Sequence, residues 1–433
     1  MKSFLLKILK TILKILAKLT IRRYRPQIVG ITGSVGKTSA KEATRAVLLG
    51  FKRVRSSPKS FNNELGLPLN ILGDWRKTGG LFFWFEVILS SIMQLTIKNQ
   101  DYPEVLILEY GVDRPGDMSY LLSIARPHIG VFTAVGEVPV HVEFFNGPEG
   151  VVREKTKLIS QLPATGFAVL NADDAAVLSV KAQTRAHVVT FGFFSGADMR
   201  IGNFNNSFEN GLGGADFKLT YGGSFVPVHL NGSLGRVRAY SSAIAAVIGL
   251  IFGMNLVKLA EALKHYESPA GRLKLIPGIK ESIIIDDTYN ASPIAMKEAL
   301  ETFKNIKAKR KIAVLGDMLE IGKYTLQAHE EIGKMAAKIV DFLIVVGIRG
   351  KFISESAIRA GFPKKSISVF MSVRDAGLFL QSKIERGDVI LIKGSQGVRL
   401  EKVVKDVMAE PQDAEKLLVR QNKEWLSKSG LYE

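Results

Sequence analysis

The segment from residue 27 to residue 50 places the strongest constraint on the fold. An apolar run, QIVGITG, leads into the glycine-rich turn GSVGKT, and the following KTSAKEATRAVLLG has helical character and ends at Gly50. A strand that passes through such a turn into a helix is suited to nucleotide phosphate, because glycine lets backbone N–H groups crowd around phosphate oxygens. The sequence therefore predicts a nucleotide-binding α/β domain.

The residues of this turn have separate predicted tasks. Lys37 supplies a cation that can reach the phosphates, and the Thr38 hydroxyl can bind Mg2+. The turn departs from the general P-loop expression, which has glycine where this chain has Ile31. We expect the nucleotide to contact Gly33, Ser34, Val35, Gly36, Lys37, Thr38 and Ser39.

The remaining sequence predicts two α/β domains. Apolar runs such as EVLILEYG and IGVFTAVG alternate with helical stretches, as in a mostly parallel, doubly wound sheet covered on both faces. Between about residues 185 and 235 the sequence consists of short alternating stretches with many Gly and Asn residues, which predicts an antiparallel patch attached to the first domain. The cluster ESPAGRLKLIPG marks a boundary near residue 270. We predict an amphipathic helix over 1–27, an ATP-binding domain over 28–270 and a Rossmann-like α/β domain over 271–433.

Composition limits the partners and the chemistry. The net charge is +18, and eight basic residues but no acid stand among the first 27 residues. A basic balance favours polyanionic partners such as nucleotides, phosphorylated precursors or acidic lipid, whereas no zinc-finger spacing or RNP-like aromatic run indicates nucleic acid. The chain has no cysteine, which excludes disulfides, thiolate metal sites and cysteine nucleophiles and fits a reducing cytoplasm.

The first 25 residues predict a helix at a membrane surface. Lys7, Lys10, Lys14 and Lys18 recur at spacings of three and four, so they form one stripe beside a leucine- and isoleucine-rich remainder. Each central lysine would cost about 2.5–3.5 kcal/mol in a membrane span, so a helix lying flat at the inner face is favoured over a span. Packing of its apolar side against the protein's own core is the alternative.

A second apolar stretch, GGLFFWFEVILSSIMQLTI over residues 79–97, is nearly long enough to cross a bilayer. A single span there would put Lys37 and Glu109 on opposite sides of the membrane, although both belong to one expected sheet. The sequence instead favours a buried or interfacial helix.

The phosphate turn resembles that of the Mur ligases, which join amino acids or peptides to cell-wall precursors with ATP. Further stretches are similar, in order, to the branch that adds D-alanyl-D-alanine, and they cover roughly residues 28 to 410. The resemblance implies an ATP- and Mg2+-dependent ligase of peptidoglycan precursor synthesis, acting as a cytoplasmic monomer. The matching stretches are FNNELGLPLNIL, LEYGVDRPGDMSYL, HVEFFNGPEGVVREKTKLI, NADD, AGRLKLI, DDTYNASPIAMKEAL, GDMLEIG and LIKGSQG.

A metal centre is expected beside the phosphate turn. Glu109 stands at the carboxyl end of a strand, where open α/β sheets bind ligands, and its carboxylate can hold Mg2+. The resemblance implies that His141 binds a second metal and that Lys155 reacts with CO2 to form a carbamate that bridges two Mg2+ ions. Thr38, Glu109, His141 and Lys155 are thus the expected metal ligands, with catalytic roles for Lys37, His141, Lys155 and Arg272.

In the last domain the resemblance assigns further ligand contacts. Arg272 is expected at the γ-phosphate, Asp287 at the ribose, and Tyr289 and Asn290 beside the base. Asp317 is expected to face the incoming dipeptide. The family's His-Asn and Asn signature is absent where GRVRAYSSAIAA stands. The expected substrate contacts are Asn62, Asn63, Asp317, His329 and Lys393.

One departure keeps other functions open. Family members carry an N-terminal domain for the UDP-sugar, whereas about 27 residues precede the first strand here, so another surface holds the precursor or the substrate is not UDP-linked. The alternatives are a ligase of this fold for another carboxylate, of polyglutamate or storage-peptide type, and a membrane-bound nucleotide-responsive scaffold without catalysis. DDTYNASP and GDMLEIG favour the cell-wall ligase, and the phosphate and metal residues disfavour the scaffold.

Overall fold

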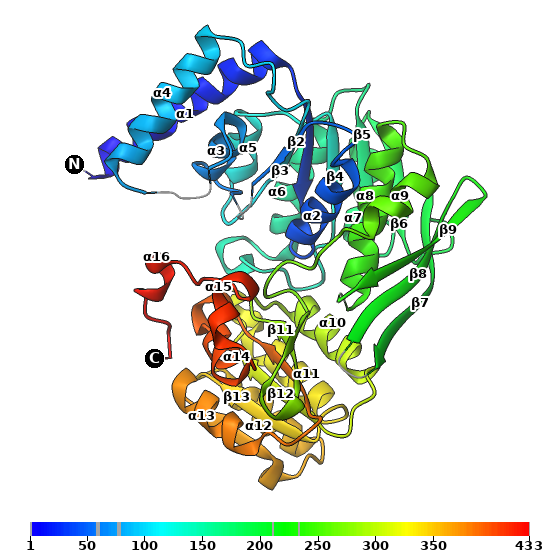
Figure 1. The fold of residues 1–433 in the computed structure, drawn as a ribbon, viewed down its shortest axis with the longest axis vertical. Coiled ribbons are helices and arrows are strands. Elements are labelled where there is room, and N and C mark those ends of the chain that lie inside the picture. The colour runs from blue at the N-terminus through cyan, green and yellow to red at the C-terminus, as the bar shows by residue number, and fades with distance from the viewer. Residues whose placement is uncertain (1, 58–60, 76–78, 210–211, 233, 433) are drawn as a thin grey trace.

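The computed structural model describes residues 2–57, 61–75, 79–209, 212–232 and 234–432. Two β-sheets organise these residues, one from the first part of the chain and one from the second (Figure 1). The strand order of the first sheet is β2-β3-β1-β4-β5-β6-β7-β8-β9, and that of the second is β10-β11-β15-β12-β13-β14. The α/β class predicted from the sequence is confirmed.

The first sheet is parallel from β2 to β7 and antiparallel from β7 to β9. The predicted antiparallel patch is therefore confirmed. In the parallel part, Ile31 of β1 pairs with Glu109 of β3, which brings the phosphate turn and this acid to the same sheet edge. The strands are β1 Gln27–Thr32, β2 Val54–Ser56, β3 Val105–Glu109, β4 Ile129–Phe132, β5 Phe167–Asn171, β6 His187–Gly192, β7 Met199–Glu209, β8 Leu212–Tyr221 and β9 Ser224–Asn231.

Helices cover both faces of this sheet. Buried apolar side chains of α2, α8 and α9 form a core with one face, and those of α1, α3, α5 and α6 form a core with the other. A helix that packs on a sheet face in this way fixes the turn that precedes it, which is how α2 positions the phosphate turn. The helices are α1 Lys2–Tyr24, α2 Lys37–Leu48, α3 Gly66–Leu72, α4 Leu81–Thr96, α5 Asp117–Leu122, α6 Pro148–Ser160, α7 Ala175–Leu178, α8 Arg236–Ile251 and α9 Leu256–Leu263.

The second sheet has the same layered arrangement. Its strands are parallel except for β10, which pairs antiparallel with β11 at one edge. Helices α10, α11 and α12 pack on one face, and α13 and α14 on the other. The strands are β10 Lys274–Pro277, β11 Ile283–Asp287, β12 Lys311–Gly316, β13 Phe342–Val346, β14 Ile367–Phe370 and β15 Val389–Lys393. The helices are α10 Pro293–Lys304, α11 Thr325–Ala336, α12 Gly350–Arg359, α13 Val373–Lys383, α14 Glu401–Val407, α15 Ala414–Leu417 and α16 Lys423–Leu426.

The N-terminal helix packs partly on the protein itself. Leu13 and Ala17 of α1 are fully buried in the core beneath the first sheet. Two members of the expected solvated lysine stripe also face the protein, because the Lys10 ammonium lies 2.5 Å from a Glu64 carboxylate oxygen and Lys14 donates to the Ser123 hydroxyl. The stripe is thus divided between the protein and solvent.

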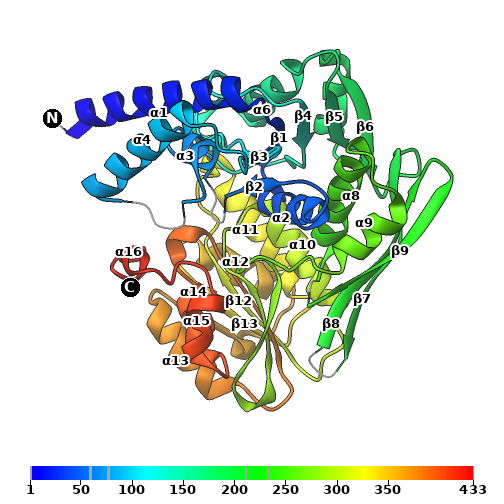
Figure 2. The same ribbon diagram turned by 45° about the horizontal axis from the view of Figure 1, so that its top comes forward.

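Helix α4 lies beside α1 in both views of the molecule (Figures 1 and 2). Only Val87 and Ser91 of α4 are buried, so of the two placements expected for residues 79–97 the structure does not support a buried helix, and the interfacial placement stays a prediction. The ends of the two helices are joined because the Tyr24 hydroxyl donates to the carbonyl of Gln94 at 2.6 Å. Within the described part of the chain, neither these helices nor any other combines the length and the hydropathy needed to cross a bilayer.

Candidate active site

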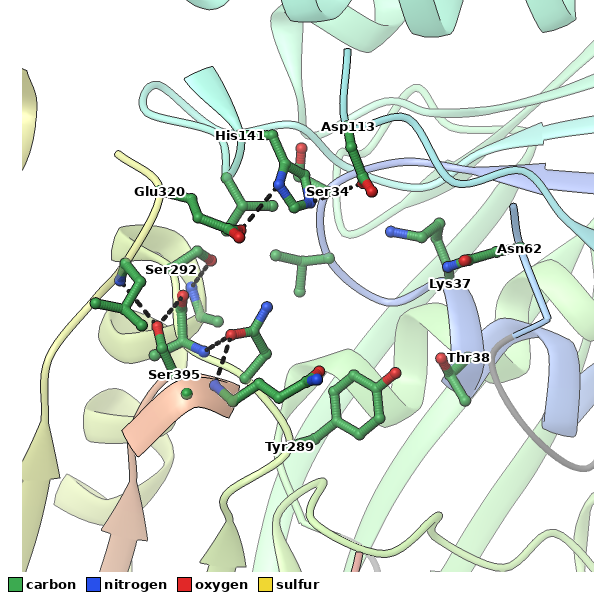
Figure 3. Close-up of a pocket in the computed structure, with 18 of the residues that line it drawn as sticks. Ser34, Lys37, Thr38, Asn62, Asp113, His141, Tyr289, Ser292, Glu320 and Ser395 are labelled. Atoms are coloured by element: carbon green, nitrogen blue, oxygen red, sulfur yellow. Dashed lines mark hydrogen bonds and ion pairs between the residues drawn. The ribbon is translucent and has the colours of Figure 1, made fainter. Parts of the chain in front are cut away.

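A cavity of about 740 Å3 lies where the carboxyl ends of the strands of both sheets meet (Figure 3). The first sheet and its connections contribute the phosphate turn, Glu109, Asp113 and His141. The second contributes Arg272, Tyr289, Asn290 and the loop around Glu320. Of the predicted site residues, those on its wall are Ser34, Val35, Gly36, Lys37, Thr38, Asn62, Glu109, His141, Arg272, Tyr289 and Asn290.

Tight backbone contacts shape the phosphate turn. Gly33 has φ 143°, and a Cβ there would lie 2.0 Å from the Thr133 hydroxyl, so only glycine fits. The Thr133 hydroxyl donates to the Val35 carbonyl at 2.6 Å. The Lys37 ammonium donates to the Gly33 carbonyl at 2.7 Å, and burial lowers its pKa. The loop therefore holds the Lys37 amine beside the backbone N–H groups that would receive phosphate.

Glu109 and Thr38 form the part of the site best suited to Mg2+. Glu109 is 1% exposed, and one carboxylate oxygen lies 3.5 Å from the Thr38 hydroxyl. The other lies 3.2 Å from the Lys41 ammonium but has no hydrogen-bond partner. A hydroxyl and a carboxylate oxygen next to a phosphate turn are ligands that Mg2+ accepts, so these two residues fit the metal.

Lys41 is a site residue that the sequence analysis missed. Burial alone would lower its pKa, but the carboxylates of Glu109 and Glu42 more than offset this and raise it. The residue therefore stays charged and fixes Glu109 beside the turn. Its position four residues after Lys37, on the same face of α2, was the available signal.

Lys155 lies behind the cavity wall and is almost fully buried. Burial, followed by the charge of Lys37, lowers its pKa to about 7. A large fraction of this amine is thus neutral near neutral pH, which is the form that reacts with CO2. Its neighbour Lys157 pairs with Glu154 at 2.7 Å instead.

His141 connects the two halves of the cavity. Its backbone has φ 66°, and its two ring nitrogens lie 3.3 Å from an Asp113 oxygen and 2.9 Å from a Glu320 oxygen (Figure 3). Asp113 and Glu320 were not singled out from the sequence, although both stand in the motifs that carried the resemblance. Of the residues that the structure describes, no group of three or more His, Cys, Asp or Glu is placed to hold a metal ion.

On the opposite wall, Arg272 stacks over the Tyr289 ring, with 4.0 Å between the guanidinium carbon and the ring centre. The Nε of Arg272 is buried without a hydrogen-bond partner. Asp287 lies behind this wall, beside a small cavity of about 30 Å3 that Ser39 also lines. Its carboxylate pairs with the Lys393 ammonium at 2.6 Å, so Lys393 holds Asp287 in place.

The structure does not bring Asp317 or His329 to a described cavity. Asp317 is fully buried, and it accepts hydrogen bonds from the Gly350 N–H at 2.8 Å and the Tyr432 hydroxyl at 2.6 Å. The His329 ring accepts from the Met318 N–H, and burial lowers its pKa, so the ring is neutral. These two residues brace the second domain, and the expected dipeptide contact of Asp317 finds no support in this geometry.

Arg238 is a second residue that the sequence analysis missed. Its buried guanidinium donates to the Ser39 hydroxyl at 2.8 Å, to the Tyr266 hydroxyl at 2.9 Å and to the Arg272 carbonyl. It thereby ties the phosphate-binding helix to the segment that carries Arg272. Two arginines, Arg236 and Arg238, at the start of a helix that continues with the uncharged AYSSAIAAVIGLI were the signal.

Two further cavities adjoin the first. One of about 510 Å3 shares Val35 and Gly36 with the phosphate turn and is lined by apolar side chains together with an amide and several acids. The other, of about 270 Å3, shares Asn62 and Asp113 with the main cavity. Its wall includes Lys10, Asn62, Asn63, Glu64, Asp117 and Tyr120, so the N-terminal helix contributes to it.

The comparison with known families decides the assignment. The Mur ligase middle domain matches residues 31–247, and the Mur ligase glutamate ligase domain matches residues 271–396. The chain belongs to the Mur ligase family. The Mur ligase fold predicted from the phosphate turn and the ordered motifs is therefore confirmed.

Proteins similar to this Mur ligase include enzymes that are named D-alanyl-D-alanine ligases. It is 29% identical over 409 residues to the UDP-N-acetylmuramoyl-tripeptide--D-alanyl-D-alanine ligase of Bacillus subtilis, covering 93% of this chain and 80% of that one. It is 31% identical over 407 residues to the enzyme of the same name from Mycobacterium bovis, covering 88% and 73%.

Two solved structures of MurF ligases have a similar fold. A MurF ligase from Thermotoga maritima in complex with ADP superposes with a TM-score of 0.76 at 26% identity, over 94% of this chain and 84% of that one. MurF from Acinetobacter baumannii has the same fold, with a TM-score of 0.73 at 22% identity over 90% and 79%.

Proposed function

We propose that this Mur ligase is an ATP-dependent peptide ligase of peptidoglycan precursor synthesis that joins D-alanyl-D-alanine to a precursor carboxylate. The observation that carries this proposal is the cavity in which Lys37, Glu109 and Arg272 converge from both halves of the chain. The names of the Bacillus and Mycobacterium relatives support the choice of dipeptide and of a cell-wall acceptor.

ATP would lie across the phosphate turn. Its phosphates would contact the backbone of residues 33–39, with Lys37 and Arg272 offsetting their charge. We propose that the base enters the 510 Å3 cavity, because that cavity meets the turn at Gly36 and Phe191 and Ile244 line it. Tyr289 and Asn290, expected beside the base, instead line the main cavity, where Tyr289 orients Arg272.

The reaction would have two steps. A carboxylate oxygen of the precursor attacks the γ-phosphorus, and the bond to the bridging oxygen breaks to release ADP. The dipeptide amine then attacks the acyl carbon of the acyl phosphate, inorganic phosphate leaves, and the nitrogen loses a proton. Asn62 and the adjoining 270 Å3 cavity lie where the acceptor can approach the turn.

We propose that Thr38 and Glu109 hold Mg2+, which when bound neutralises charge on the phosphates. His141 is a candidate for a second ion, for which it would exchange its contact with Glu320. Lys155 is a candidate for carbamylation, because its pKa of about 7 leaves the amine partly neutral.

We further propose that the reaction takes place in the cytoplasm, where ATP is available, and that the protein acts as a monomer. A peripheral contact with the membrane through residues 1–25 completes this proposal. The basic and apolar residues of this segment support it, since five of its basic residues, Lys7, Lys18, Arg22, Arg23 and Arg25, are exposed.

Phosphate release tests the proposed function. Purified full-length protein would be given ATP, D-alanyl-D-alanine and a panel of UDP-linked and lipid-linked muramoyl tripeptides, with product identified by mass. We expect release only when acceptor and dipeptide are both present, and none from Lys37→Ala. Turnover with glutamate as the amine but not with the dipeptide would favour the polyglutamate-type ligase, and no turnover with any pair would favour the scaffold.

A further inference from the structure

Helices α1 and α4 present a shared exposed apolar surface. The two helices form an arm at the upper left of the molecule in both views (Figures 1 and 2). Phe82 is 91% exposed, which is far beyond what a folded domain usually leaves in water for an aromatic residue. This α1–α4 apolar face consists of Leu5, Ile8, Ile15 and Leu19 of α1 and Phe82, Phe85, Leu89, Ile92 and Met93 of α4.

The exposed residues follow helical spacing. In α4 the positions 82, 85, 89 and 92 are separated by three, four and three residues, and in α1 the positions 5, 8, 15 and 19 fall on one similar stripe. The opposite sides are already packed, since Leu13 and Ala17 of α1 are buried. Each helix therefore has two apolar sides, of which the protein's core covers one.

The two stripes belong to neighbouring helices. Residues 5 and 23 are separated by 18 positions, or about five turns of 3.6 residues, and so lie on the same side of α1. The Arg23 guanidinium donates to the Thr96 carbonyl at the end of α4. The side of α1 that carries Leu5 thus borders α4, and both helices belong to the same arm of the molecule (Figures 1 and 2).

Basic residues surround this surface. Lys7, Lys18 and Arg22 of α1 are exposed, and Lys98 follows α4. The sequence contains no acid before Glu42, and Glu86 is the single charged residue of α4. An apolar strip with a basic border complements the acyl chains and the anionic headgroups of a bilayer.

A second copy of the chain is a poorer occupant. A two-fold interface would bring the same patch of each copy together and place the two basic borders against each other. The repulsion between like charges opposes that pairing, whereas anionic lipid relieves it.

We propose that the α1–α4 apolar face is a monotopic membrane-docking surface that inserts into the headgroup region of an anionic bilayer. This inference rests on the peripheral membrane contact of the proposed function and extends it. It adds α4 as an element that inserts into the membrane, while Lys10 and Lys14 of α1 stay in contact with the protein. Lys10 lies five residues from both Leu5 and Ile15, about 140° around the helix. It lines the 270 Å3 cavity, so docking leaves that cavity uncovered.

Vesicle flotation of the full-length protein tests the surface. The probes are vesicles of phosphatidylcholine alone and of phosphatidylcholine mixed equally with phosphatidylglycerol. We expect binding to the anionic vesicles, and a loss of roughly tenfold or more in the double variant Phe82→Ser/Phe85→Ser. The matched control is Phe194→Ser/Phe225→Ser, which removes two phenylalanines that are 54% and 58% exposed elsewhere. A second variant, Lys18→Glu/Arg22→Glu, should weaken binding and reduce its dependence on salt.

Several outcomes would overturn the docking surface. These are equal vesicle binding by the Phe82/Phe85 variant and the control, no binding by the unmodified chain, or a dimer in ultracentrifugation that the Phe82/Phe85 variant converts to monomer. Ligation in free solution is measured in parallel. Intact ligation with lost docking keeps the proposed function, and intact docking without ligation keeps the surface while the function fails.

Discussion

The two walls of the main cavity differ in how their polar groups are satisfied. On the wall from the first domain, the Ser34 hydroxyl is buried without a hydrogen bond, one Glu109 oxygen has only the Lys41 ammonium at 3.2 Å, and Lys155 has a pKa lowered to about 7. On the wall from the second domain the Arg272 Nε is also without a partner, but behind that wall charged groups are paired with one another. Asp287 pairs with Lys393, and Asp317 accepts hydrogen bonds from Tyr432 and α12.

This difference separates groups available to ligands from groups that support the site. A buried polar atom without a partner costs about 1–3 kcal/mol, and a bound phosphate or metal can recover that cost. A paired group gains nothing from a ligand unless its pair breaks. We therefore expect substitutions in the first domain to affect catalysis and those at Asp317 to affect stability.

Of the variants that compare the two walls, Lys155→Ala should have the largest effect. If the Lys155 carbamate bridges the metal ions, its loss should reduce ligation by roughly 10²–10³-fold. A short carboxylic acid added to Lys155→Ala should restore part of the activity, because its carboxylate can occupy the carbamate position. The measurement is phosphate release with and without the acid.

Arg153→Ala is the matched control for this variant. Arg153 is on the same helix two residues away, and its side chain is exposed. Its replacement should leave turnover within about twofold, since exposed charges contribute little. Near-normal turnover by Lys155→Ala would contradict the carbamate and remove the main argument for a reactive first wall.

Asp317→Asn tests the second wall and should be intermediate in effect. The neutral amide keeps the shape but weakens the contacts with Gly350 and Tyr432, so we expect a loss of about 1–3 kcal/mol in the free energy of unfolding. Tyr432→Phe removes one of these hydrogen bonds and should cost about 0.5–1.5 kcal/mol. Urea unfolding measures both values.

The same variant distinguishes the support role from the dipeptide contact expected from the sequence. With a supporting Asp317, the dipeptide KM of Asp317→Asn should stay close to that of the unmodified enzyme. A raised dipeptide KM at unchanged stability would restore the original expectation.

The sequence predicted the layered fold and the first wall well, because each depends on local patterns. The turn around Gly33 needs a conformation and a close approach that only glycine allows, and Lys37 and Thr38 follow it directly. Glu109 ends a strand whose register against β1 brings it to the turn. Short-range spacing and sheet topology therefore determine this wall.

The second wall and α4 were less predictable, because they depend on distant partners. The direction of the Asp317 carboxylate is set by Tyr432, 115 residues later in the chain, and no local pattern reports that contact. For α4, an apolar helix has the same sequence whether it is buried or exposed. In the structure α4 packs on the core through Val87, Phe83 and Trp84, which leaves Phe82 and Phe85 in solvent.

Glu320→Gln should have the smallest effect, because it acts on one partly exposed contact between the two walls. The His141 ring lowers the pKa of Glu320, so the pair stabilises the protein at neutral pH, and that contribution is lost as pH falls below the ordinary glutamate pKa near 4.5. The Glu320 side chain is 44% exposed, so solvent screening keeps the contribution under about 1 kcal/mol. The free energy of unfolding in urea should be lower for Glu320→Gln than for the unmodified chain at neutral pH and equal to it at low pH. The control Glu143→Gln, at an exposed acid beside His141, should match the unmodified chain at both pH values. An equal difference in the free energy of unfolding at both pH values would show that the contact between His141 and Glu320 does not depend on charge. His141 could then bind a metal without first losing a charged partner.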